Sequence, residues 1–254
     1  MSRTLAGALR NYTGFWLGRD GQLTPIPNST VTVAAGLSAG LGDVLFNNDG
    51  TRLVGVEVGP TKGPSQIDSF RVNWNGTLTA APGSPFPAQG LGPFGSEFSP
   101  INPNQLFVSN AHNGTGLGTV SAFNDSWNAR LSPIGASPFA DDQTAPCWLV
   151  ISHDGQYLYA FNTASATVSS YSIARDGTLT LIGSSTQLTG IAGAGTDITL
   201  STDDRTLYLN EAGNHTVAAF AVDGGTLAQL AGSPYPTPAG ATTSGLVVAE
   251  VRSR

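Results

Sequence analysis

Gly177-Thr178-Leu179-Thr180 is one copy of a short phrase that returns along the whole chain. The other copies are Gly21-Gln22-Leu23-Thr24, Gly76-Thr77-Leu78-Thr79, Ala129-Arg130-Leu131-Ser132 and Gly225-Thr226-Leu227-Ala228. The interval between successive copies is roughly 50 residues, which is the length of one propeller blade. Self-similarity at this period, built from short strand-like pieces, is typical of a β-propeller. The sequence therefore predicts an all-β propeller.

The third repeat shows how the four strands of a blade are arranged. An apolar run at 148–151 leads into a Ser-His-Asp-Gly turn at 152–155, and an aromatic-rich stretch follows at 157–162. The aromatic content of 157–162 suits a pleated, half-buried strand, residues 167–173 give a third strand, and 178–182 follow a second Asp-Gly turn. These pieces predict four antiparallel strands joined by tight turns, and no segment shows helical periodicity.

The repeats divide the chain into blades within a single domain, 1–254. Four complete blades are expected at about 36–87, 88–140, 141–189 and 190–238. Residues up to about 28 resemble the third and fourth strands of a blade, and 244–251 resemble an innermost strand. Joining 1–35 to 239–254 would form a composite blade and bury the last open edges. We therefore expect about five blades, and a monomer if the ring closes.

Composition excludes several classes of function. The chain has 254 residues, of which 40% are hydrophobic and 11% charged, so it can bury a large core. Its net charge is −6 and Lys62 is its only lysine, which argues against nucleic-acid binding. No apolar run approaches the roughly 20 residues of a membrane-spanning helix. We expect neither a nucleic acid nor a membrane as partner.

Cellular location rests on weak signals. Cys147 is the single cysteine, so no intrachain disulfide can form. Six asparagines begin an Asn-x-Ser/Thr sequon, where chance would give about three, and this favours export to the extracellular space. Asn-Gly-Thr is also a good turn sequence, so a cytoplasmic location stays open. The six are Asn11, Asn28, Asn75, Asn113, Asn124 and Asn214.

Two repeat positions at the predicted channel mouth hold unusual residues. One lies three residues before the apolar anchor of each first strand and is occupied by Asp43, Gly95, Trp148 and Asp197. The other lies near the end of each second strand and is occupied by Glu57, Asn110, Asn162 and Glu211. Asparagine there can cap the following turn, whereas glutamate is a poor substitute for that purpose. Two blades therefore carry an Asp/Glu pair at the same spacing.

These four carboxylates, with Glu97 close by, are predicted to converge on one mouth. Adjacent carboxylates raise one another's pKa, so one of them could act as a general base near neutral pH. The same acidic ring could hold a divalent cation through oxygen ligands, although no cofactor is required. Acidic residues at strand entries also often cap loops or lie solvated on a rim, and that alternative remains.

The histidines divide between the two ends of the blades. His112 and His215 fall in or after loops on the candidate face, and His153 lies in a first turn at the opposite end. Two motif matches lack the structural context that they need. Residues 36–40 satisfy G-x-S-x-G and residues 90–95 satisfy G-x-G-x-x-G, but neither is followed by a predicted helix.

Three stretches resemble repeats of the β-propeller lactonase family, which includes 6-phosphogluconolactonase-like and carboxymuconate cyclase-like enzymes. They are Ala145-Pro146-Cys147-Trp148, the run from His153 to Tyr159, and Leu207-Tyr208-Leu209-Asn210-Glu211. The segment from Ser84 to Gly95 is similar to the blade-entry loops of that family. The resemblance implies a ring of seven blades, so we expect this chain to lack two N-terminal blades and any signal peptide before them. Glu211 is the site residue that the resemblance carries over.

The leading hypothesis is a lactonase-like hydrolase, or a lactone-forming cycloisomerase, acting on a small carboxylate or sugar lactone at the channel mouth. Glu211, helped by Glu57, would deprotonate the attacking water, and His112 would hydrogen-bond the oxyanion. The candidate substrate-binding residues are Asp43, Asp197, Glu97, Trp148 and His215. The alternative is a non-catalytic propeller that serves as a binding or interaction module.

Overall fold

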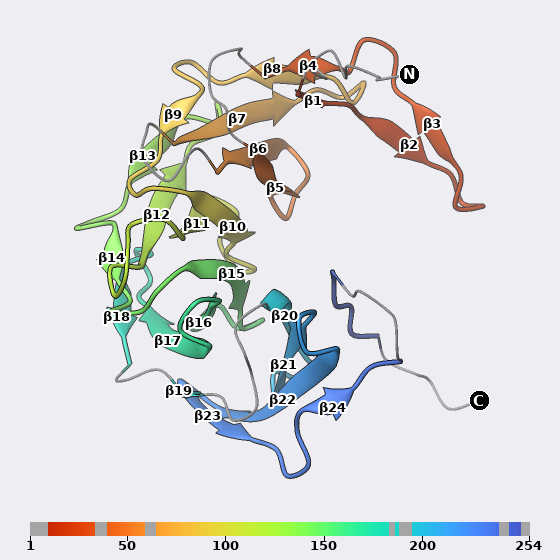
Figure 1. Ribbon diagram of the computed structural model, residues 1–254. Helices are drawn as coiled ribbons and strands as arrows, with labels where there is room; N and C mark the ends of the chain where they lie inside the picture. The colour runs from red at the N-terminus through yellow and green to blue at the C-terminus, as the bar shows by residue number, and fades with distance from the viewer. Residues whose placement is uncertain are drawn as a thin grey trace, which may run out of the picture.

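The computed structural model describes residues 10–33, 40–58, 65–182, 186–187, 195–238 and 244–249. All regular secondary structure in these ranges is β-strand, which confirms the predicted all-β class. Figure 1 shows the sheets arranged in an arc around a common centre, with β5, β10, β15 and β20 at its inner edge. The ranges that the structure describes contain no helix long and apolar enough to cross a membrane.

Four blades share one plan, in which four antiparallel strands follow each other from the centre outwards and a short fifth strand pairs with the third. Blade I comprises β5 (Leu41–Phe46), β6 (Arg52–Glu57), β7 (Gln66–Val72), β8 (Leu78–Ala80) and β9 (Phe86–Pro87). Blade II comprises β10 (Pro93–Phe98), β11 (Gln105–Asn110), β12 (Thr119–Asp125), β13 (Leu131–Pro133) and β14 (Phe139–Ala140).

Blades III and IV repeat this plan along the rest of the chain. Blade III comprises β15 (Pro146–Ile151), β16 (Tyr157–Asn162), β17 (Thr167–Ile173), β18 (Leu179–Leu181) and β19 (Thr186–Gln187). Blade IV comprises β20 (Gly195–Leu200), β21 (Thr206–Glu211), β22 (Thr216–Asp223), β23 (Thr226–Gln229) and β24 (Tyr235–Pro236). In the four blades, the pairing between the first and second strands shifts register partway along the first strand, before its apolar end. The residues at the shift therefore depart from the regular strand pairing.

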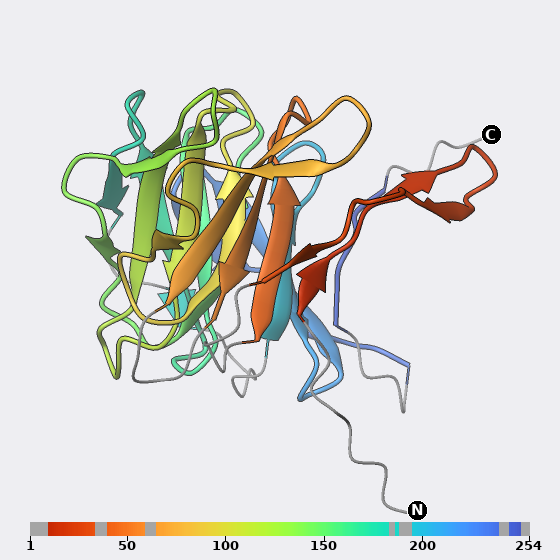
Figure 2. The ribbon, with the colours of Figure 1, turned by 90° about the horizontal axis from the view of Figure 1, so that it is seen from above.

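The N-terminal residues form part of one more blade. Strands β1 (Asn11–Tyr12) and β2 (Phe15–Leu17) pair with β4 (Val31–Thr32) and β3 (Leu23–Pro25), as β7 pairs with β9 and β8. They are thus the third and fourth strands that the sequence predicts, and we call them the half-blade. Residues 244–249 form no strand, and no ladder joins them to the half-blade among the described residues, so the composite blade stays a prediction. Figure 2 shows the β2–β3 hairpin projecting from the blades on the side where 244–249 also run.

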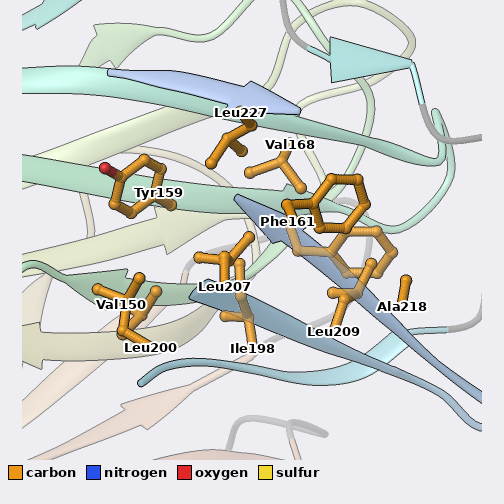
Figure 3. Close-up of a cluster of buried hydrophobic side chains, with 11 residues drawn as sticks. Val150, Tyr159, Phe161, Val168, Ile198, Leu200, Leu207, Leu209, Ala218 and Leu227 are labelled. Atoms are coloured by element: carbon orange, nitrogen blue, oxygen red, sulfur yellow. The ribbon is translucent and has the colours of Figure 1, made fainter. Parts of the chain in front are cut away.

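The hydrophobic core lies between the blades rather than at the centre of the arc. Figure 3 shows one such layer, in which Tyr159, Phe161 and Val168 of blade III pack on Leu207 and Leu209 of blade IV. Two equivalent layers join blade I to blade II and blade II to blade III. Because each layer needs a face from both neighbours, a blade at the end of the arc exposes one apolar face.

Blade I is the blade whose inner strand has an open face. Phe46 is 53% exposed, whereas the equivalent Phe98, Ile151 and Leu200 are 4%, 7% and 5% exposed beneath the preceding blade. An apolar cavity of about 750 Å³ lies over this face, between β5 and the half-blade residues Tyr12, Phe15 and Trp16. The half-blade supplies the outer strands of a preceding blade but covers the inner strand of blade I only in part.

Candidate functional site

Asp43 of β5 links the inner strands of blades I and II. Its Oδ2 accepts hydrogen bonds from the backbone N–H of Ser96 at 3.0 Å and from the Ser96 hydroxyl at 2.7 Å. Its Oδ1 accepts from the backbone N–H of Val44 at 2.8 Å. Both N–H groups lie where their own strands shift register, at Val44 in β5 and at Ser96 in β10, so the carboxylate bridges the two irregular sites.

Asp197 of β20 repeats this geometry at the other end of the arc. Its Oδ1 accepts from the backbone N–H of Ile198 at 2.9 Å, and its Oδ2 accepts from the backbone N–H of Leu246 at 2.6 Å. Leu246 therefore stands to Asp197 as Ser96 stands to Asp43. This contact joins 244–249 to the inner strand of blade IV.

The carboxyl group of Glu97, on β10, lies close enough to both aspartates for their charges to affect its pKa. Burial raises its pKa to about 8, and the negative charges of Asp43 and Asp197 contribute to the rise. Its neighbours in the strand, Ser96 and Phe98, are buried in the blade interface. The three inner strands thus bring three carboxyl groups to the centre of the arc, as the sequence predicts for Asp43, Asp197 and Glu97.

Glu97 also lines a cavity of about 270 Å³ among β10, β15 and β20. The other lining residues include Val150, Thr199 and Leu200, and the rim includes Asn48 and His153. Asn48 and His153 belong to the turns between first and second strands, so the cavity opens at that end of the blades. The sequence-based expectation was a site at the opposite end, near the loops between second and third strands.

Glu211 is fully buried and neither of its carboxylate oxygens has a hydrogen-bond partner among the described residues. Burial alone raises its pKa to about 7. The reason for its isolation is visible in the repeat. Asn110 and Asn162 at the same position donate to Ser121 and Ser169 at 2.8 Å, whereas blade IV carries an alanine in place of that serine.

Glu57 is buried as well, but it has a partner. Asp68 fills the serine position in blade I and accepts hydrogen bonds from Glu57 and from the Tyr12 hydroxyl, the latter at 2.9 Å. Burial and the charge of Asp68 raise the pKa of Glu57 to about 7, and a charge on Arg10 opposes this rise. The pair therefore holds β1 against blade I. Reasoning from sequence missed Asp68. The strand register, which pairs Asp68 with Gly55, would have indicated that Asp68 lies near Glu57.

The remaining predicted residues lie apart from the central carboxyl groups. The His112 side chain lies over Gly92, and its Nδ1 is buried without a partner among the described residues. His215 is an exposed turn residue with φ of 55°. Trp148 contacts Phe94 edge to face at 5.2 Å. His153 binds Asp204 at 2.6 Å in its turn, as expected of a turn residue.

The structure therefore divides the candidates into groups. It gathers Asp43, Glu97 and Asp197, and it does not bring Glu57, Glu211 and His112 together in one described cavity. A group of three or more Asp, Glu, His or Cys side chains suited to a metal ion is absent from the described ranges. The arrangement at Glu97 can accept and return a proton beside a small cavity, and this is the chemistry that it offers.

Comparison with known proteins identifies the repeats. Residues 105–194 match the family model described as "Lactonase, 7-bladed beta-propeller". No curated protein sequence matches the chain.

Three solved structures show the same fold at low sequence identity. A putative 6-phosphogluconolactonase from Bacteroides fragilis is 22% identical with a TM-score of 0.72, and the match covers 89% of this chain and 65% of that one. A protein from Lactobacillus plantarum is 19% identical with a TM-score of 0.73, covering 92% and 67%. The periplasmic gluconolactonase of Pseudomonas aeruginosa is 21% identical with a TM-score of 0.62, covering 88% and 63%. The chain thus spans about two thirds of the length of these relatives.

Proposed function

We propose, because residues 105–194 match the family model of the seven-bladed β-propeller lactonases, that the chain is a lactonase-like hydrolase with Glu97 as its proton-transfer group. One observation carries the assignment to Glu97. Among the carboxyl groups whose pKa is raised towards neutrality, it is the one that lines a described cavity large enough for a small molecule. Glu57 and Glu211 have raised pKa values but are buried and line none of the described cavities.

The chemistry follows from the position and the pKa of Glu97. In its ionised form the carboxylate removes a proton from a water molecule, whose oxygen then bonds to the lactone carbonyl carbon. When the tetrahedral intermediate collapses, the ring C–O bond breaks and protonated Glu97 returns the proton to the departing alkoxide. Lactone and water thereby give a hydroxy acid, and Glu97 ends as it began. Thr199 supplies a hydroxyl group to the cavity lining for the developing oxyanion.

Charge in the cavity indicates the class of lactone. The described lining contains Glu97 but no lysine or arginine, and Asp43 and Asp197 add negative charge nearby. An anionic substrate would meet repulsion there without a compensating cation. We therefore favour an uncharged sugar lactone over a phosphorylated one. The same argument disfavours the lactone-forming cycloisomerase, whose substrate would be a small carboxylate.

The test compares two glutamates in the hydrolysis of glucono-1,5-lactone. Glu97→Gln keeps the size of the side chain but cannot transfer a proton, so kcat/KM is expected to fall about 100-fold. Glu211→Gln serves as the matched control, since Glu211 is equally a raised-pKa carboxyl but lies outside the cavity. Retained activity in Glu97→Gln would contradict the assignment. Loss of activity in Glu211→Gln but not in Glu97→Gln would instead assign the catalytic role to Glu211, as predicted from the sequence.

The second candidate function, a non-catalytic interaction module, is favoured by the open face of blade I. Val44 and Phe46 are both 53% exposed, and the apolar cavity beside them offers a place for another apolar chain segment. Wild-type protein that hydrolyses neither neutral nor phosphorylated sugar lactones above the spontaneous rate would support this function over the enzyme.

A further inference from the structure

Exposed tryptophans form an unexplained feature of the outer surface. Trp74 is 96% exposed, Trp127 is 79% exposed and Trp16 is 50% exposed, although the chain has only four tryptophans. Large aromatic side chains in a soluble protein are normally buried, because each removes a large apolar area from water. None of the three belongs to a described core cluster. Trp16 lines the apolar cavity beside blade I, whereas the fold gives no such reason for Trp74 and Trp127.

Trp74 and Trp127 occupy the same place in two neighbouring blades. Each is the second residue of the tight turn between the third and fourth strands, closed by backbone hydrogen bonds from Gly76 to Asn73 at 2.8 Å and from Ala129 to Ser126 at 2.7 Å. These turns are held firmly, since the Asn73 side chain also donates to the Thr77 hydroxyl at 2.9 Å. The indoles are thus presented on rigid supports, which lowers the entropy cost of binding.

We group four residues on adjacent elements of the half-blade, blade I and blade II as the aromatic ridge, defined as Trp16, Arg71, Trp74 and Trp127. The Arg71 guanidinium of blade I lies 5.9 Å from the centre of the Trp127 ring of blade II. The Trp16 indole of the half-blade lies beside Gly76, within the turn that carries Trp74. The ridge therefore crosses the half-blade, blade I and blade II along the outer ends of their turns.

The chemistry of the ridge selects among possible partners. A net charge of −6 and a single arginine in the ridge argue against an anionic membrane or a nucleic acid. The amides of Asn73 and Asn75 and the hydroxyls of Thr77 and Thr79 bond to one another within the Trp74 turn, so the exposed indole faces carry the recognition, and a flat indole face matches a pyranose ring. Such a ring has an apolar C–H face for stacking and a rim of hydroxyl groups for hydrogen bonds.

We propose that the aromatic ridge binds a neutral polysaccharide chain whose sugar rings stack on Trp74 and Trp127. The ridge lies on the outside of the blades and shares no residue with the cavity at Glu97. The binding site therefore goes beyond the proposed hydrolase function and does not depend on it. It would attach the protein to a carbohydrate surface.

Affinity electrophoresis in native gels tests this proposal. Wild-type protein is run with and without soluble mixed-linkage β-glucan, xylan or galactomannan, alongside Trp127→Ala and the Trp74→Ala/Trp127→Ala double variant. Leu117→Ala is the control, because Leu117 is 61% exposed but lies outside the ridge. We expect at least one polysaccharide to retard the wild type and the control, with the dissociation constant raised about tenfold by Trp127→Ala and more by the double variant.

Three results would overturn the proposal. They are the absence of retardation by all three polysaccharides, retardation that the double variant retains, and ridge-dependent binding to phosphatidylcholine vesicles without binding to polysaccharide. Circular dichroism of the variants establishes that a lost interaction reflects the ridge and not unfolding. Both turns lie at the surface, so the substitutions are expected to leave the denaturant midpoint of unfolding unchanged.

Discussion

Replacing Glu211 by glutamine is expected to stabilise the fold by about 2–3 kcal/mol at pH 8. The carboxyl group is fully buried, lacks a hydrogen-bond partner among the described residues and has a pKa raised from 4.5 to about 7. At pH 8 it must therefore be ionised in a buried site without a hydrogen-bond partner among the described residues, which costs free energy that an uncharged amide of the same shape does not. Denaturant unfolding of the two proteins measures the difference.

The pH dependence has a definite sign. In the unfolded chain Glu211 ionises near pH 4.5, whereas the folded protein keeps its proton until about pH 7. Stability attributable to this group therefore falls as pH rises between these values and is constant above them. The gain from Glu211→Gln should vanish near pH 4. Asn162→Ala is the control at the equivalent position and should destabilise instead, because its amide is hydrogen-bonded. A Glu211→Gln protein less stable than the wild type at pH 8 would contradict this account.

Arg52→Ala is expected to lower the free energy of unfolding by about 3–5 kcal/mol at pH 8. Arg52 reaches from blade I into blade II, where its Nη1 donates to the carbonyls of Asp125 and Ser126 and its Nη2 donates to the carbonyl of Pro103 at 2.9 Å. Its Nε lies 3.5 Å from the buried Asp125 carboxylate. Burial raises the pKa of Asp125 to about 7 even beside this cation. Removing Arg52 leaves a buried carboxyl without its counter-charge.

Two controls separate the lost charge from the lost packing. At pH 5 Asp125 is largely protonated, so the cost of Arg52→Ala should be smaller than at pH 8. Adding Asp125→Asn to Arg52→Ala should recover part of the stability at pH 8, because no uncompensated charge remains. A loss independent of pH and of the second substitution would assign the effect to the three carbonyl hydrogen bonds alone.

Much of the fold could be predicted because it depends on local patterns. The aromatic stretch 157–162 and the stretch 167–173 are strands β16 and β17 with the predicted bounds. Turn residues and strand alternation act within one blade, so a single repeat contains the information. The third and fourth strands of the half-blade followed from the same phrase at Leu23.

The site could be predicted only in part, because its decisive contacts join different blades or different strands. The charges of Asp43 and Asp197 act on Glu97, because all three residues belong to inner strands, whereas Glu57 and Glu211 lie apart from them. The isolation of Glu211 depends instead on Ala218, and the pairing of Glu57 depends on Asp68. Those neighbours come from the strand register, which fixes whether a carboxyl group meets a partner or an apolar surface.

The pH dependence of kcat/KM for glucono-1,5-lactone, corrected for spontaneous hydrolysis, tests the central role of Glu97 most directly. The account predicts that kcat/KM rises with pH through an inflection near pH 8, the pKa of this carboxyl group, and that Glu97→Gln removes the inflection. An unchanged profile in Glu97→Gln would contradict it, as would an inflection near pH 7 that disappears only in Glu211→Gln.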